Sequence, residues 1–335
     1  MLFVSVGCAA KVDRFTLDRV VKRAGAIDDL VMVCELGVSL AHGLRALPRN
    51  DPHRALISAE TVAGVCAQQD AWEAGLSAAR AQANLGQLGI VRAAEVTDAT
   101  LAADRHHTLA AGRFERAWGH LVAQHPGIDT GTCPSIRSRD EVAVLLGLVS
   151  GTLALLHDRA AGGPLGVPLD RPLLVARGAA CLEDARWWST PSALQAGAWA
   201  TVPGSAPEGV DPWALLDEAA ARGDTSGTRV ARAVQVLLAS NAGRTADVEA
   251  GIRAFVAVPP ASLDPEWVLL DRYAATLVLH QSDVLWTAHS GHRTEQLGTL
   301  PSDAAPAETG PDWFGGDDPF GSGVEEETAP PESAP

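Results

Sequence analysis

Histidine and aspartate lie close together at several points of the 335-residue chain, and such side chains can bind metals or transfer protons. Asp104 and His107 are three residues apart, which places both on one face of a predicted helix. No Glu-x-x-His pair occurs, so a ferritin-like di-metal site lacks its parts. His289 and His292 flank a predicted helix end and could hold a metal adventitiously. A solvated helix face for the first pair, and a favourable charge at a helix terminus for the second, explain these residues without a ligand.

The adjacent pair His157 and Asp158 ends a long apolar run. The string Leu-Leu-His-Asp at this point resembles the central motif of HD-domain phosphohydrolases. The resemblance implies an all-helical enzyme in which this pair, an earlier His and a later Asp hold divalent metals that activate water. It places His120 or His125 as the earlier ligand and Asp184 as the later one. The alternative is a histidine that complements the dipole at a helix C-terminus.

Motifs of other enzyme classes are missing from the sequence. There is no Gly-x-Ser-x-Gly elbow, no Gly-x-Gly-x-x-Gly loop, and neither Lys11 nor Lys22 lies in a phosphate-binding loop. Kinase, P-loop and Rossmann chemistry are therefore disfavoured. We predict no catalytic residue and no cofactor, with a divalent metal only under the phosphohydrolase alternative.

The elements that position these residues are predicted to be helices, and the predicted fold class is all-α. Hydrophobic residues make up 47% of the chain but aromatic residues only 5%, so the core consists mainly of Ala, Leu and Val, of which Ala and Leu favour helices. Apolar periodicity predicts an N-terminal helical bundle over 1–161. Its helices are expected at 14–47, 58–85, 97–125 and 141–160, the last behind a capping box formed by Ser138 and Glu141.

A Gly/Pro-rich segment at 162–168 predicts a boundary, followed by a second region of shorter helices over 165–289. A capping side chain directly before a proline predicts the start of several of these helices, as at Asp211-Pro212. They are expected at 171–188, 191–201, 212–222, 227–241, 246–257 and 265–288. Trp187 and Trp188 close the first of them, either as core packing or as the wall of a pocket.

The five cysteines show no C-x-x-C spacing and are interpreted as small, reduced, buried side chains. The apolar segment 1–10 is too short for a membrane span and lacks a basic flank. We therefore expect a cytoplasmic protein with no membrane association. Nearly all positive charge comes from Arg, which indicates a GC-rich, bacterial genome.

The net charge of −15 is concentrated near the C-terminus. After Arg293 there is no Lys or Arg, and nine acidic residues follow from Asp303 onward. Residues 290–335 are also rich in Gly, Pro and Ser, so they are predicted to form a disordered acidic tail. Direct nucleic-acid binding is not expected, because that needs clustered basic residues. Within the tail, Trp313, Phe314 and Phe320 are candidate anchors for a protein partner. The alternative is a generic tail that keeps the protein soluble.

Three functions remain open on the sequence. The favoured hypothesis is a non-catalytic helical interaction or accessory protein that docks a partner through its acidic, aromatic-bearing tail. The second is an HD-type metal-dependent phosphohydrolase that uses His157, Asp158 and His120. The third is a helical regulator or a mobile-element accessory protein, although no basic recognition helix is evident.

Overall fold

The computed structural model describes residues 11–47, 52–83, 90–259 and 262–303. Every regular element within these ranges is a helix, which confirms the all-α fold class. Contacts group the chain into two units, Met1–Leu300 and Pro301–Pro335. In the second unit only the short 3-10 helix η6 (Pro301–Asp303) is described, so Trp313, Phe314, Phe320 and most of the predicted tail lie outside the described residues.

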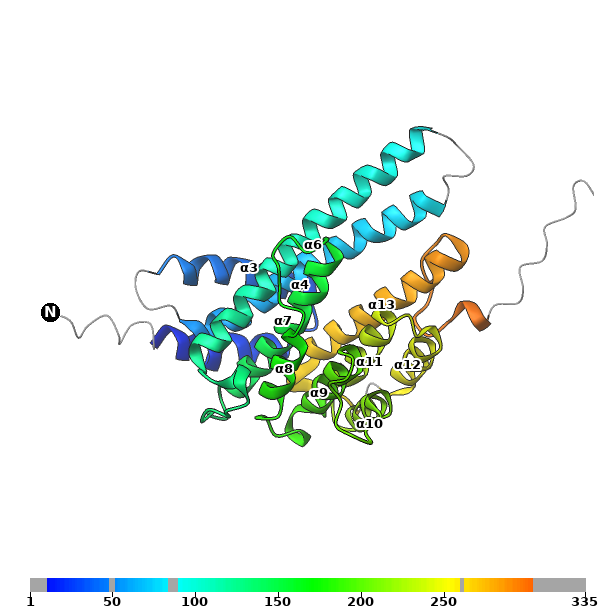
Figure 1. Cartoon of the computed structure of the whole chain (residues 1–335). Helices are drawn as coiled ribbons and strands as arrows, with labels where there is room; N and C mark the ends of the chain where they lie inside the picture. The colour runs from blue at the N-terminus through cyan, green and yellow to red at the C-terminus, as the bar shows by residue number, and fades with distance from the viewer. Residues whose placement is uncertain (1–10, 48–51, 84–89, 260–261, 304–335) are drawn as a thin grey trace, which may run out of the picture. The chain divides into compact units, whose positions relative to one another are not determined.

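Two long helices form the most extended feature of the first unit (Figure 1). α4 (His53–Ala83) and α6 (Ile90–Gln124) run side by side as a helical hairpin. α3 (Leu30–Arg45) packs against α4, and α7 (Glu141–Ala160) packs against both hairpin helices. Both helices start earlier than predicted, at His53 and Ile90, and each ends one or two residues before its predicted bound.

The predicted helix over 14–47 is wrong in one respect, because the chain breaks near Asp29. A π-helical segment, η1 (Thr16–Val21), and the short helix α2 (Lys22–Gly25) precede the break. The Asp29 carboxylate then caps α3 by accepting the Met32 amide at 2.9 Å. An N-cap satisfies an otherwise unpaired amide of the first turn, so it favours a new helix start over continuation.

α7 lies at the centre of the packing and buries side chains around its whole circumference. Glycines make this possible, because they let α6 approach closely: a Cβ at Gly147 would come within 2.9 Å of Leu121 Cβ. The Ser150 hydroxyl also contacts the Thr61 hydroxyl of α4 at 2.8 Å. α7 has the length and hydropathy of a membrane-spanning helix, but two thirds of its apolar stretch is buried inside the protein, as in a soluble core helix.

Six α-helices follow the loop at 162–168 in the part of the chain that the structure describes. They are α8 (Arg171–Ala179), α9 (Thr190–Thr201), α10 (Pro212–Asp224), α11 (Val230–Asn241), α12 (Thr245–Ala257) and α13 (Val268–Ser290). The predicted Asp211 cap is confirmed, since its carboxylate accepts the Trp213 and Ala214 amides at 3.0 and 3.3 Å. Two buried clusters join α6 and α7 to these helices. The division into regions 1–161 and 165–289 stays a prediction.

Two predicted boundaries are corrected around Trp187. The capping box does not form, because Glu141 instead accepts the Trp187 indole N–H at 2.9 Å. α8 ends at Ala179 rather than at 188, and Trp188 takes a left-handed backbone conformation with φ of 52°. A bulky residue in that conformation cannot continue a helix.

The start of the predicted tail also differs from expectation. Residues 291–300 belong to the first unit, where the Leu300 side chain is 1% exposed. The Thr299 carbonyl accepts the Trp286 indole N–H at 2.9 Å, and the Asp283 carboxylate accepts the Thr294 amide at 3.1 Å. These contacts fix the segment after α13 on the helical body.

The interpretation of the cysteines as reduced thiols is wrong for four of them. Cys34 of α3 and Cys66 of α4 form one disulfide, and Cys133 and Cys181 form another, with Cα–Cα distances of 5.5 and 5.3 Å. Each disulfide covalently links two segments that lie far apart in the sequence. Stable disulfides are rare in reducing compartments, so the pairing does not favour the predicted cytoplasmic location, which itself stays a prediction.

The close approach of α6 and α7 is testable at a pair of glycines. We expect Gly151→Ala to destabilise the protein by about 1–3 kcal/mol through overpacking, because the new Cβ would lie within 2.5 Å of Trp118 Cε3. The matched change Gly119→Ala in α6 has nothing within 4 Å and should stabilise by about 0.5–1 kcal/mol. Urea unfolding measures both values, and a neutral or stabilising Gly151→Ala would contradict this packing.

Candidate functional site

Three histidines from three different helices line one cavity of about 600 Å³, which we name the histidine cavity. His107 belongs to α6, His157 to α7 and His280 to α13, while α4 and α11 complete the walls. The cavity therefore lies where the α4–α6 hairpin, the central helix and the last long helix meet. Across the described ranges, no group of three His, Cys, Asp or Glu side chains has the arrangement of a metal site.

The imidazoles of His107 and His157 are hydrogen-bonded to each other. Their Nδ1 atoms lie 2.7 Å apart, so one ring must donate and the other accept. The donor ring then carries its proton on Nδ1 and has a free lone pair on Nε2. The acceptor ring carries its proton on Nε2. The pair thus holds two different tautomers and offers one acceptor and one donor.

Burial keeps these imidazoles uncharged at neutral pH. Burial, with the neighbouring His107 and His280, lowers the pKa of His157 to about 3 from its ordinary value of 6.5. Burial, with His107 and Arg293, lowers the pKa of His280 to about 3 as well. Burial also lowers the pKa of His107. No Asp, Glu, Lys or Arg is among the described residues that line the cavity, so its wall is neutral.

Aromatic rings hold the imidazoles in place. Trp72 of α4 stacks on His280, with ring centroids 4.3 Å apart and planes at 9°. Phe114 of α6 packs on His157, with centroids 5.6 Å apart. Most of the remaining wall is apolar, with side chains such as Leu76, Leu156, Leu237 and Val284. Rigid aromatic and aliphatic walls with a few polar groups are typical of ligand pockets.

One polar atom at the cavity has no protein partner. The Thr287 side chain lines the cavity and is 3% exposed, and its Oγ1 makes no hydrogen bond within the described part of the chain. Gln281 of the same helix is also buried at the cavity wall. A buried hydroxyl without a partner costs free energy.

His157 and Asp158, the pair predicted from the HD-like motif, do not act on the same site in the structure. His157 lines the cavity, whereas both oxygens of Asp158 accept backbone amides, those of Leu165 and Val167, each at 2.8 Å. The Asp158 carboxylate therefore holds the loop after α7. This arrangement gives Asp158 a structural role beside a buried histidine that lines the cavity.

The other proposed metal ligands lie with different partners. His120 contacts His53, with Nδ1 atoms 2.9 Å apart, and neither residue lines the histidine cavity. His125 is buried, and its Nε2 has no partner among the described residues. Asp184 accepts the Ser192 amide at 2.9 Å at the start of α9. The structure does not bring His120, His125 or Asp184 to His157.

The sequence singles out two of the three cavity histidines, His157 in the HD-like motif and His107 beside Asp104, but it does not connect them. A solvated helix face explains the spacing of His107, yet its side chain is half-buried and bonded to His157. His280 belongs to no motif. Its position three residues after Leu277 and four before Val284 places an imidazole on an apolar helix face, which is the one signal that could have found it.

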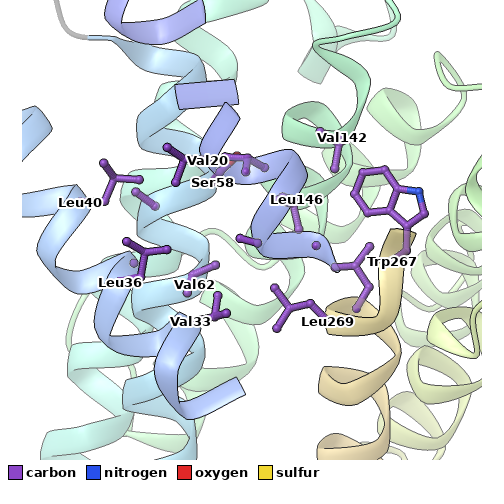
Figure 2. Close-up of a pocket in the computed structure, with 16 residues that line it drawn as sticks. Val20, Val33, Leu36, Leu40, Ser58, Val62, Val142, Leu146, Trp267 and Leu269 are labelled. Atoms are coloured by element: carbon purple, nitrogen blue, oxygen red, sulfur yellow. The ribbon is translucent and has the colours of Figure 1, made fainter. Parts of the chain in front are cut away.

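A second hollow is almost entirely apolar, and Ser58 is the one polar side chain among the described residues that line it. It measures about 70 Å³ and lies between η1, α3, α4, α7 and the start of α13. Figure 2 shows Leu36, Val62, Leu146 and Leu269 around it, with the Trp267 indole at one edge. Its small volume is that of a packing gap between helices.

The paired tryptophans belong to the core. Trp187 and Trp188 are 3% and 4% exposed, and both pack edge-to-face on Trp267. A cleft of about 590 Å³ beside them is lined by both acidic and basic side chains. The Arg186 guanidinium there is already paired with the Glu141 carboxylate at 3.3 Å.

The lowered pKa of His157 predicts a pH-dependent stability. In the unfolded chain this histidine takes up a proton near pH 6.5, whereas the folded protein resists protonation until about pH 3. The free energy of unfolding should therefore fall as the pH drops below 6.5, with His157 contributing up to about 1.4 kcal/mol per pH unit. His157→Gln should flatten the slope measured by urea unfolding between pH 7 and 4.5. His42→Gln, on the exposed face of α3, should leave it unchanged, and equal slopes in all three proteins would contradict the neutral, buried state of His157.

Comparisons with known proteins supply no relative from which a function could be transferred. The chain matches no protein-family model, no curated protein and no solved structure.

Proposed function

We propose that this chain is a non-catalytic helical binding protein whose histidine cavity takes up a small, uncharged, amphipathic molecule. The supporting observation is the cavity itself, which has about 600 Å³ of space, apolar walls and a few convergent polar groups. The volume and the mostly apolar lining with a few polar side chains are typical of small-molecule pockets.

Binding is favoured over acid–base catalysis by the protonation state of the histidines. An efficient general base has a pKa near the working pH. His157 and His280, with pKa values of about 3, are weak proton acceptors at pH 7. Because they are not protonated to imidazolium at this pH, they also cannot act as general acids. Their neutral rings can still donate and accept hydrogen bonds, as recognition requires.

The cavity can be tested with a neutral fluorescent probe and one substitution. Gly75 of α4 lines the cavity, and a Cβ added at this residue would have nothing within 4 Å, so Gly75→Phe should fill open space without disturbing the fold. N-phenyl-1-naphthylamine should bind the natural protein with an increase in fluorescence, and Gly75→Phe should weaken binding at least tenfold.

The matched control is Gly43→Phe in α3, where a side chain also meets nothing within 4 Å and does not reach the cavity. Circular dichroism should show both variants folded. The proposal fails if the natural protein does not bind the probe, or if both variants bind it equally well.

A second function is supported by composition. The acidic residues after Asp303, with Trp313, Phe314 and Phe320 among them, favour docking to a protein partner that offers a basic, apolar groove. This proposal is compatible with ligand binding by the helical body. The phosphohydrolase and mobile-element hypotheses stay predictions without a further supporting observation.

The docking role is testable by deletion. Removal of residues 304–335 should leave the melting temperature of the helical body unchanged, because its clusters end at Leu300. The same deletion should abolish partner capture in a pull-down from the source cells, as should replacement of Trp313, Phe314 and Phe320 by Ala. A control that exchanges three tail prolines for Ala keeps both charge and aromatics. Capture that survives the deletion would contradict a docking tail.

A further inference from the structure

We infer that a further cleft, which we name the Arg159 cleft, binds an organic anion made of an apolar chain and one carboxylate. The cleft measures about 440 Å³ and is lined by α7, α9, α11 and the residues around the start of α8. This site goes beyond the proposed function, because its ligand is charged and the wall of the histidine cavity is neutral. Three features carry the inference: an apolar floor, an unpartnered guanidinium and an exposed leucine at the rim.

The floor of the Arg159 cleft is apolar because three helices turn a leucine toward it. Leu155 of α7, Leu194 of α9 and Leu238 of α11 all line the cleft and are buried. On α7, Thr152, Leu155 and Arg159 follow one another at intervals of three and four residues, so one helix face carries both the floor and the cation. Burial of an alkyl chain against such a floor is favourable.

The Arg159 cleft carries a single charge. Arg159 is exposed, and its guanidinium has no hydrogen bond or ion pair with any described residue. No Asp, Glu or Lys and no second Arg is among the described residues that line the cleft. A guanidinium can bond both oxygens of a carboxylate in parallel. One positive charge also balances one negative charge, so a monocarboxylate matches the cleft better than a phosphate dianion does.

The loop after α7 adds an apolar rim to the cleft. Leu169 lines the cleft, and its side chain is 69% exposed. The Asp158 carboxylate holds this loop through the Leu165 and Val167 amides, each at 2.8 Å. A ligand chain on the leucines would remove apolar surface from water. Its carboxylate would meet Arg159 at the exposed rim, where neither ion has to leave water completely.

Three ligands test this chemistry. Isothermal titration of the full chain at pH 7.5 and low salt would use octanoate, octylammonium and butanoate. Octanoate should bind at least tenfold more tightly than octylammonium, which has the same chain and the opposite charge. It should also bind at least thirtyfold more tightly than butanoate, because each buried methylene raises the affinity about fourfold. No binding of octanoate, or equal binding of either other ligand, overturns the inference.

Substitution of the arginine tests the role of its charge. Arg159→Gln changes an exposed side chain, so it should fold, and it should weaken octanoate binding at least fivefold. Arg159→Lys keeps the charge and should recover part of the affinity. The matched control is Arg105→Gln in α6, because Arg105 is also exposed, has no side-chain partner among the described residues and lines neither space. Unchanged octanoate affinity in Arg159→Gln overturns the inference.

Two further variants locate the site. Ala242 is exposed, follows α11 directly and lines the Arg159 cleft, so Ala242→Trp should weaken octanoate binding at least tenfold and leave N-phenyl-1-naphthylamine binding unchanged. Gly75→Phe, which fills the histidine cavity, should have the reverse effect. Octanoate binding that is lost in Gly75→Phe and kept in Ala242→Trp would place the anion in the histidine cavity and overturn the inference.

Discussion

The burial of α7 is the constraint on which the rest of the structure depends. This helix is apolar on every side, so it must be covered by neighbours all around. Gly147 and Gly151 provide the room, because they let Leu121 and Trp118 of α6 reach its backbone. The same helix ends with two polar residues that have different tasks. Asp158 ties down the following loop through two amides, and His157 faces the histidine cavity. The close packing of α7 thus fixes the position of the cavity.

The treatment of charge distinguishes this cavity from the rest of the body. Buried carboxylates elsewhere in the described residues meet a guanidinium or a backbone amide. Arg54 bridges Asp13 and Asp140 at 3.2 and 3.0 Å, and Arg116 pairs with Glu60 at 3.0 Å. Such pairing is needed because an unpaired buried charge is strongly destabilising. At the histidine cavity the polar groups are instead neutral and only partly satisfied, which is what recognition of an uncharged ligand requires.

Local signals in the sequence predict much of the helical framework. Periodicity and the Asp211 cap place α7, α9, α10 and α12 to within a few residues. One failure has a tertiary cause and one a local cause. Glu141 bonds Trp187 instead of closing a capping box, and Asp29 starts a helix within an unbroken apolar pattern. Local sequence patterns cannot predict the cavity, because its histidines come from three helices far apart in the chain and no motif connects them.

The stability of the fold alone does not explain three neutral histidines at one cavity. Below pH 6.5 a buried imidazole favours the unfolded chain, which can take up the proton that the folded protein refuses. Leucine or phenylalanine at His107, His157 and His280 would fill the same space with no such penalty and would leave no polar atom to satisfy. The Thr287 hydroxyl adds to this cost, since valine has the same shape without the unpaired oxygen. Four polar side chains that an apolar core would replace line one cavity, and the proposed binding function would give the histidines among them a use.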